Sequence, residues 1–301
     1  MTRRTLGLSP KSLLVKYRTS DMVLFVIIIV VYALTYNMNP FQRQFSLNDL
    51  SIQHPFAKRE RVTNNELFLY STIVPLITII TMGLPFTTPP KYRIYNTLIG
   101  VIGLLLSVGI TTIVTNILKN YIGRLRPDFI ARCVPKEGTP VDILVFAKDV
   151  CTTTDIANLL DGFRTTPSGH SSMSFAGLFY LTLWISGQLY ASDFIVGSWR
   201  AVLAWVPTLG AALIAISRTE DYRHHFIDVT LGSLLGLLIA LWSYFRLFPK
   251  LTHDQCHYSL NVLQDMDEKE NEMQQRVAAD AISTDDRSTL DERTYSALQS
   301  V

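Results

Sequence analysis

Two cations stand close together at the end of an apolar run, where they could bind an anion. Lys119 closes the run, and the chain continues as KNYIGRLRP, which puts Arg126 seven residues later. Seven residues make just under two turns of α-helix, so both side chains point the same way if the helix continues. Pro127 disfavours helix at Arg126, and we expect the helix to end there. Taken alone, such a pair more often consists of cations that extend to a membrane surface.

A second polar motif, Pro167-Ser168-Gly169-His170, comes directly before another apolar run. A serine at this place is a typical helix N-cap, and Gly169 lets backbone N–H groups approach a ligand closely. A helix N-terminus favours negative charge because its first N–H groups are unpaired and its dipole is positive there. The motif predicts an oxyanion site, although an ordinary cap beside an interfacial histidine has the same sequence.

A third set of polar residues fills the gap between the last two apolar runs. Ser217 and Arg218 end one run, and TEDYR leads to His224, His225 and, inside the next run, Asp228. An aspartate within a membrane span is costly and is therefore a functional hypothesis. Its carboxylate could hold an imidazole by one ring nitrogen. Spacing allows either histidine, since residues three and four positions before Asp228 both reach it on a helix.

Six apolar runs, each long enough to cross a bilayer, position these motifs. Only 17% of the 301 residues are charged and 48% are hydrophobic, against about 25% charged in soluble domains. Such a chain cannot present a normal solvated surface. We therefore predict an all-α integral membrane bundle of six transmembrane helices. The runs lie near residues 22–36, 67–84, 94–118, 172–190, 201–216 and 226–245.

The chain divides into three expected regions. Residues 1–21 form a basic N-terminus, residues 22–248 form the six-span domain, and residues 249–301 form an acidic tail. The early lysines and arginines favour a cytosolic N-terminus, and six spans then place the tail in the cytosol too. Many acids and no apolar run predict that the tail is disordered. The net charge of +2 sums a basic start and an acidic end, so it does not indicate nucleic-acid binding.

With six spans, all three motifs lie at one membrane face. Lysine and arginine together with a helix N-terminus make a phosphate cage. A histidine oriented by a carboxylate is a candidate nucleophile, and a second histidine is a candidate acid. No run of carboxylates typical of a magnesium site lies near these motifs. The residues predict phosphoryl transfer without a metal or another cofactor.

In this order, K-x6-R-P, P-S-G-H and S-R-x5-H-x3-D resemble the signature of the type 2 phosphatidic acid phosphatase (lipid phosphate phosphatase) superfamily. The signature runs from Lys119 to Asp228 with every position filled, and the six-span layout extends the resemblance to residues 20–248. The stretch HPFAKRERVTNNELFLYSTIVP is, in addition, similar to fungal diacylglycerol pyrophosphate phosphatases.

The resemblance implies a role for each residue of the three motifs. It implies that His224 attacks phosphorus and forms a phosphohistidine, that Asp228 orients His224, and that His170 protonates the leaving group. It implies an all-helical core, metal-independent catalysis and a site on the lumenal or extracellular face. The remaining motif residues would bind the phosphate oxygens: Lys119, Arg126, Ser168, Gly169 and Arg218.

The expected substrates are phosphatidate, diacylglycerol pyrophosphate or both, and also lysophosphatidate, all held in the bilayer. The sequence does not rank these against isoprenoid or sphingolipid phosphates, and it does not name the oligomeric state. Glucose-6-phosphatase-like enzymes and soluble haloperoxidases share the cage, but six spans disfavour the latter. We expect an endomembrane such as the vacuole or Golgi, with the plasma membrane as the alternative.

Two alternatives come from other classes of protein. A membrane protein that only binds lipid would be marked by loss of His170 or His224, and both are present. A transporter is disfavoured because the polar residues lie at the ends of spans rather than at the bilayer midplane.

Three cysteines are too few for a disulfide scaffold. Cys133 and Cys151 both lie in the long loop before Pro167, which the topology puts in an oxidising compartment. We therefore expect a disulfide between them. Cys256 lies beyond the last span, on the reducing side, and we expect it to be free.

Overall fold

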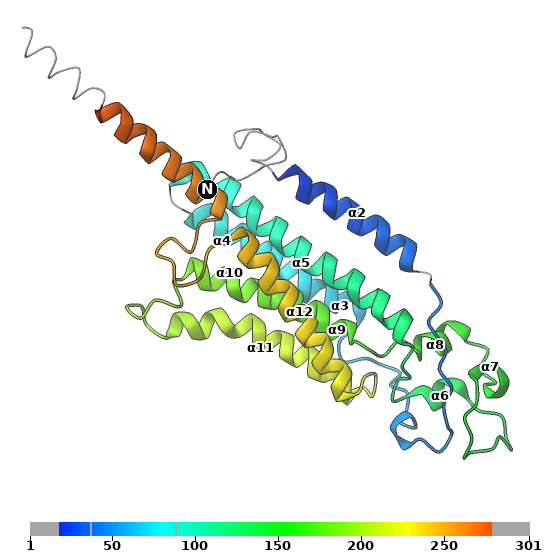
Figure 1. Cartoon of the computed structure of the whole chain (residues 1–301). Coiled ribbons are helices and arrows are strands. Elements are labelled where there is room, and N and C mark those ends of the chain that lie inside the picture. Colours follow the sequence, from blue (N-terminus) through cyan, green and yellow to red (C-terminus); the bar gives the residue numbers. More distant parts are fainter. Residues whose placement is uncertain (1–17, 37, 88, 279–301) are drawn as a thin grey trace, which may run out of the picture.

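The structure is a computed structural model that describes residues 18–36, 38–87 and 89–278, and it consists of long helices packed side by side (Figure 1). Two π-helical turns, η2 (Leu69–Ile73) and η4 (Phe175–Phe179), join α3 to α4 and α9 to α10. The described part has no strand, only two isolated bridges, so the all-α prediction is confirmed. The helices are α2 (Thr19–Tyr36), α3 (Asn64–Phe68), α4 (Val74–Phe86), α5 (Arg93–Ile122), α6 (Phe129–Cys133), α7 (Ala147–Val150), α8 (Ile156–Asp161), α9 (Gly169–Ser174), α10 (Tyr180–Gln188), α11 (Trp199–Glu220) and α12 (Phe226–Leu247).

Within the described residues, five helical segments are long and apolar enough to cross a membrane. They are Thr19–Tyr36, Asn64–Pro85, Pro90–Ile122, Trp199–Glu220 and Phe226–Leu247. Large apolar side chains on α2 and α11 point away from the rest of the protein, as a lipid-facing surface requires. The chain is therefore a multi-pass membrane protein.

The sixth expected span is the continuous helical run α9–η4–α10, which is long enough but less apolar than the other five. It is almost entirely buried, and it packs against α5, α11 and α12. The serines at 171, 172 and 174 in its first turns are buried. Since neighbouring helices rather than lipid surround this run, it can carry small polar residues that would be costly in contact with lipid.

Hydrogen bonds to backbone carbonyl oxygens join this central run to α5 and α5 to α12. Ser107 donates to the carbonyl of Ala176 at 2.8 Å, and Tyr180 donates to that of Gly100 at 3.0 Å. Ser243 of α12 donates to the carbonyl of Gly103 at 2.7 Å. Side-chain hydroxyls of this kind stabilise helix pairs in membranes, where hydrophobic driving force between helices is weak.

The region expected to be a disordered tail, residues 249–301, is ordered over its first part, so that expectation is corrected as far as residue 278. Residues 260–278 are helical and extend from the end of the bundle opposite α6, α7 and α8 (Figure 1). The side chain of Asn96 donates to the carbonyl of His257 at 2.9 Å and accepts from the N–H of Ser259 at 2.7 Å. The tail holds this path because it contributes buried side chains to the bundle. Residues 279–301 and 1–17 lie outside the described part.

The loop between α5 and α9 folds into a small unit at the other end of the bundle. Phe129, Phe163 and neighbouring apolar side chains form a separate core there together with Phe45 and Ile52 of the segment after α2. Cys133 and Cys151 form a disulfide there, with their Cα atoms 4.7 Å apart. Cys256, at the opposite end, is a free, buried thiol. This unit carries Asp161, whose carboxylate accepts a hydrogen bond from Arg126, a residue of the first motif.

A glycine on α12 allows the turn that precedes α9 to lie against that helix. A Cβ built on Gly232 would lie 2.5 Å from the carbonyl oxygen of Ser168 and 3.2 Å from its nitrogen. Only hydrogen fits at such a distance from backbone atoms. The Ser168 N–H also donates to the carbonyl of Asp228, one turn earlier on α12, at 2.9 Å.

We predict that Gly232→Ala lowers the thermal unfolding midpoint in detergent, by an amount equivalent to about 1–3 kcal/mol, as overpacking does. The matched control is Gly210→Ala on α11, where the added Cβ would meet only Leu178 Cδ1 at 3.8 Å. Gly210→Ala should leave the midpoint near that of the wild type. Equal midpoints for the two variants would contradict the close contact at Gly232.

Candidate active site

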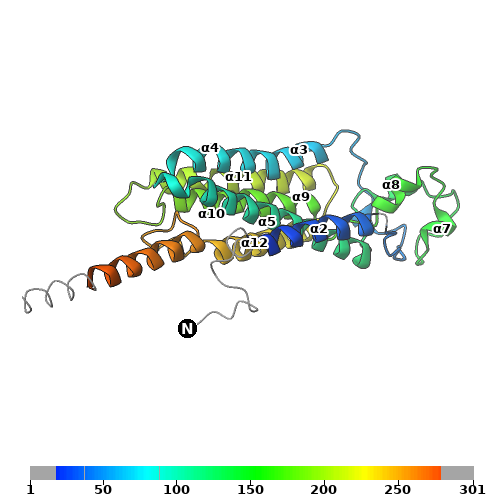
Figure 2. The same cartoon turned by 90° about the horizontal axis from the view of Figure 1, so that it is seen from above.

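The three motifs meet at one end of the bundle, where α5 and α11 end and α9 and α12 begin. Figure 2 shows the bundle from above, with α7 and α8 at the end away from the C-terminal helix. Lys119 lies in the last turn of α5, and Arg218 lies in the last turn of α11. Ser168 caps α9, with its hydroxyl accepting from the N–H of Ser171. His224 lies in the turn between α11 and α12. Segments up to about a hundred residues apart in sequence thus supply one site.

The helix that carries Lys119 ends earlier than expected. α5 stops at Ile122, whereas we predicted helix as far as Arg126. Gly123 takes the left-handed conformation, with φ of 60°, and its N–H bonds to the carbonyl of Lys119. A Cβ at Gly123 would overlap the carbonyl oxygen of Phe41, so glycine is required there. Arg126 therefore reaches the site from a loop rather than from the helix.

Lys119 and Arg126 are both held by oxygen atoms of the 161–164 segment. The ammonium of Lys119 donates to the carbonyl of Arg164 at 2.7 Å. Arg126 donates through Nε to the carbonyl of Asp161 at 2.9 Å, and it pairs with the Asp161 carboxylate at 2.9 Å. Partial burial raises the pKa of Asp161, but the charges of Arg126 and Arg132 lower that pKa by more, so it lies well below its usual range. Asp161 is therefore ionised at neutral pH and fixes the guanidinium of Arg126.

Arg218 and His170 share a partner in the segment before α3. The guanidinium of Arg218 donates to the Val62 carbonyl at 3.1 Å and pairs with Glu60 at 3.0 Å. His170 Nε2 lies 3.0 Å from the same carbonyl oxygen. Because a carbonyl only accepts, Nε2 of His170 carries a proton in this arrangement. The segment around Val62, which we call the strap (residues 57–63), therefore contacts two residues of the predicted site.

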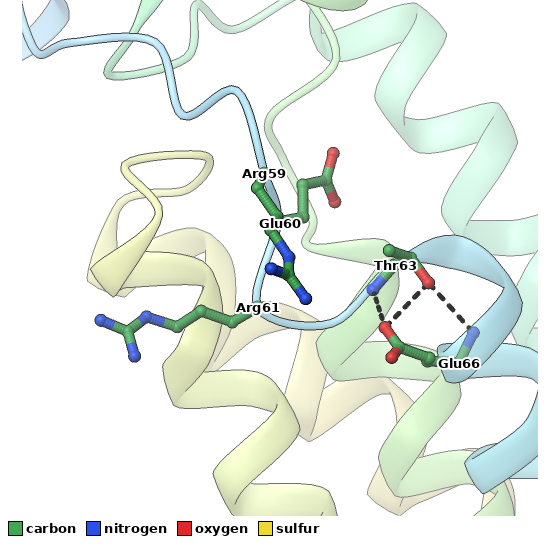
Figure 3. Close-up of a pocket in the computed structure, with 5 residues that line it drawn as sticks. All are labelled: Arg59, Glu60, Arg61, Thr63 and Glu66. Carbon is green, nitrogen blue, oxygen red and sulfur yellow. Dashed lines mark hydrogen bonds between the residues drawn. The ribbon is translucent and has the colours of Figure 1, made fainter.

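A pocket of about 450 Å³ lies on the strap and is lined by charged side chains (Figure 3). Arg61 pairs with Glu220 at the end of α11 at 2.8 Å. Thr63 caps α3 and exchanges hydrogen bonds with Glu66, which forms a capping box. These contacts fix the strap against α3 and α11. The pocket is lined by Arg59, Glu60, Arg61, Thr63 and Glu66.

The carboxylate of Asp228 is fully buried and accepts several hydrogen bonds. One oxygen accepts from the Thr166 hydroxyl and from Arg124, the latter at 3.1 Å. The other accepts from the Thr165 hydroxyl at 2.8 Å and from the backbone N–H of His225 at 2.9 Å. The ring of His225 lies 3.1 Å from this second oxygen. The direct ring contact of Asp228 is therefore with His225, a pairing that the sequence spacing had left open.

His224 is linked to the same carboxylate through a hydroxyl. Its Nδ1 lies 3.1 Å from Oγ1 of Thr165, which in turn contacts Asp228. The structure therefore places one side chain, Thr165, between His224 and Asp228, and the orientation of His224 by Asp228 stays a prediction. The three sequence motifs did not include Thr165. Its position two residues before the P-S-G-H motif was the feature of the sequence that could have indicated a place in the site.

The cations of the cage surround His224, whose side chain is 3% exposed. Burial lowers the pKa of His224 well below its ordinary value of 6.5, and the positive charges of Arg126, Lys119 and Arg218 lower that pKa further. His224 is therefore a neutral imidazole at neutral pH. A neutral imidazole surrounded by cations can attack an electrophile that carries negative charge.

Several contacts of the site come from residues that the motifs do not contain. Glu60 lies in the stretch that had been noted only for its similarity to fungal proteins. Asp161 ends α8, and Arg223, which pairs with Glu60, lies in the turn between α11 and α12. Isolated charged residues are common at such places, so the types and spacing of these two residues carried no signal. Arg124, by contrast, lies two residues before Arg126 in the first motif.

The region that contains all three motifs, residues 100–251, matches the family model of the PAP2 superfamily. A second comparison agrees: the chain is 50% identical over 251 residues to diacylglycerol pyrophosphate phosphatase 1 of Saccharomyces cerevisiae, covering 83% of this chain and 86% of that protein. The chain belongs to the PAP2 superfamily.

Other members of the PAP2 superfamily are also similar over most of their length. A probable diacylglycerol pyrophosphate phosphatase 1 of Schizosaccharomyces pombe is 40% identical, over 77% of this chain and 81% of that protein. Lipid phosphate phosphatase 2 of Arabidopsis thaliana is 31% identical, over 78% of each chain. No solved structure matches the chain.

We predict that Arg126→Gln raises the pKa of His224, because one of the charges that lower it is removed. His224 must be unprotonated to act, so the acid limb of the kcat/KM profile should move to higher pH. The comparison is made on one substrate, so that the ionisation of the substrate cancels. Arg200→Gln, at the start of α11 and far from the site, is the control. An unmoved acid limb in Arg126→Gln would show that Arg126 does not act on His224.

Proposed function

We propose that this protein is a lipid phosphate phosphatase that hydrolyses phosphatidate and diacylglycerol pyrophosphate through a phosphohistidine on His224. The observation that carries the proposal is the buried position of His224 beside Lys119, Arg126 and Arg218 at the end of a membrane bundle. The names of the fungal and plant relatives support the same class of substrate. The phosphate is bound by Lys119, Arg126 and Arg218 together with the N-terminus of α9.

The first step of the proposed reaction forms the phosphoenzyme. Nε2 of His224 attacks phosphorus, an N–P bond forms, and the bond between phosphorus and the leaving oxygen breaks. The cage cations neutralise the charge that develops on the phosphoryl oxygens. His170 acts here as an imidazolium: it transfers its Nε2 proton to the leaving lipid oxygen and becomes a neutral imidazole. For this transfer it must release the Val62 carbonyl that it contacts in the structure.

The second step releases inorganic phosphate. Water attacks the phosphorus of the phosphohistidine, and His170, now unprotonated, accepts a proton from that water. The N–P bond breaks and the electron pair returns to Nε2 of His224. The enzyme is then in its starting protonation state, and all of the chemistry is carried by side chains of this chain.

We also propose that the site faces the lumen of an endomembrane compartment, such as the vacuole or Golgi, or the outside of the cell. The disulfide between Cys133 and Cys151 lies at the same end as His224 and supports this orientation, since disulfides persist in oxidising compartments. The free thiol of Cys256 lies at the opposite end, as expected for a cytosolic face.

The purified protein should release phosphate from phosphatidate and diacylglycerol pyrophosphate in detergent micelles that contain EDTA. His224→Ala should abolish both activities and form no phosphoenzyme, because the attacking nitrogen is absent. Lysophosphatidate, a sphingolipid phosphate and an isoprenoid pyrophosphate complete the panel. Full loss of activity in EDTA, or turnover by His224→Ala, would refute the proposed mechanism.

We predict that His170→Ala affects the two main substrates unequally. Phosphatidate expels an alkoxide whose conjugate acid has a pKa near that of water, about 16. Diacylglycerol pyrophosphate expels a phosphate monoester with a second pKa of about 6, which needs little help from an acid. A general acid typically contributes about 10²- to 10⁴-fold.

Most of that factor should therefore be lost from kcat/KM on phosphatidate, and distinctly less on diacylglycerol pyrophosphate. Both lipids are assayed in one detergent system. Equal losses on both lipids would make His170 a binding residue rather than the general acid.

A further inference from the structure

The hydroxyl of Thr165 lies between the proposed nucleophile and its buried carboxylate. Oγ1 of Thr165 is 3.1 Å from Nδ1 of His224 and 2.8 Å from Oδ2 of Asp228. Thr165 and Asp228 are fully buried, and His224 is nearly so. Because water does not reach this buried position, the Thr165 hydroxyl has few hydrogen-bond partners other than His224 and Asp228.

The direction of the two hydrogen bonds follows from a count of protons. Asp228 receives donors on both oxygens, including Arg124 and the N–H of His225, as expected for an ionised carboxylate that only accepts. The hydroxyl of Thr165 has a single proton, and this proton is donated to Asp228. Thr165 can then only accept from His224. Nδ1 of His224 must therefore carry the ring proton, which leaves the lone pair on Nε2.

We propose that Thr165 is a positioning residue that selects the reactive tautomer of His224 and transmits the charge of Asp228 to it. This inference rests on the proposed function, and it adds to the proposed site a residue that lies outside the three motifs. When Nε2 forms its bond to phosphorus, the ring becomes cationic while keeping its proton on Nδ1. The chain from Nδ1–H through the Thr165 hydroxyl to Asp228 stabilises that cation. Thr165 itself neither gains nor loses a proton.

The neighbouring threonine provides a matched control. Thr166 donates to the other oxygen of Asp228, and within the described residues its hydroxyl has no hydrogen bond with His224. It is also buried and adjacent in sequence to Thr165. Replacing either hydroxyl removes one donor from the same carboxylate, but only Thr165→Val breaks the link to the imidazole. A role in packing or in stabilising Asp228 alone predicts similar effects for the two variants.

The first test measures the rate constant of phosphoenzyme formation by rapid quench with phosphatidate labelled in its phosphate. Thr165→Val should lower this rate constant by about 10- to 100-fold, as loss of an outer partner of a functional histidine commonly does. KM should change little, because the cage is intact. Thr165→Ser should recover most of the rate, and Thr166→Val should lose distinctly less of it than Thr165→Val. Equal losses in Thr165→Val and Thr166→Val, or no loss in Thr165→Val, would overturn the proposal.

The second test does not depend on a lipid substrate. Vanadate can form a bond to Nε2 of a histidine, whereas inorganic phosphate only occupies the cage, and calorimetry in micelles measures both affinities. Thr165→Val should weaken vanadate binding by about 10-fold or more and leave phosphate binding unchanged. Unchanged vanadate binding would overturn the role of Thr165. A wild-type protein that hydrolyses no lipid phosphate yet shows this vanadate effect would refute the proposed function alone.

A variant that fails to fold is recognised by the loss of its cooperative unfolding transition. In that case Thr165→Cys takes the place of Thr165→Val, because a thiol is close in size but is a weak acceptor. Thr165→Cys should then show the loss of phosphorylation rate and of vanadate affinity that Thr165→Ser does not show. Wild-type behaviour of Thr165→Cys in both tests would overturn the proposal.

Discussion

A buried carboxylate, that of Asp228, joins the segments that form this end of the bundle. An ionised group inside a protein is tolerated only where donors and opposite charge replace water. Here the donors come from Arg124, from the hydroxyls of residues 165–166 and from the N-terminal turn of α12. The carbonyl of Asp228 also binds the N–H of Ser168. One residue thus ties the loop after α5, the turn before α9 and the start of α12 into a single arrangement.

Three cations that would otherwise repel one another lie around His224. Each is oriented by protein oxygen atoms: Arg126 by Asp161, Lys119 by a carbonyl of the same segment, and Arg218 by the strap. Such partners limit the repulsion between the three cations. Burial lowers the pKa of His224, and the same positive charges lower it further, so one arrangement serves both the binding of a phosphate and the reactivity of the nucleophile.

Much of the fold and the membership of the site could be predicted because they depend on local patterns. Apolar runs of sufficient length determine where helices cross a membrane, and the parity of the spans places the three motifs at one face. The run that begins at Gly169 shows the limit of that argument, since it is surrounded by protein and does not need to be apolar. The prediction of a disordered tail was wrong as far as residue 278 for a related reason. Acidic residues dominate the composition of the tail, but a few of its side chains near Val262 pack against the bundle.

The sequence by itself determined the helical membrane class, the family signature and the residue types of a phosphate cage. These depend on composition and on spacing within short segments. The tertiary structure alone decided which groups touch: that α5 ends at Gly123, that the ring of His225 contacts Asp228, and that His224 reaches it through Thr165. Hydrogen bonds are directional and short, so their partners depend on how loops far apart in the chain are folded, which spacing along a single helix does not specify.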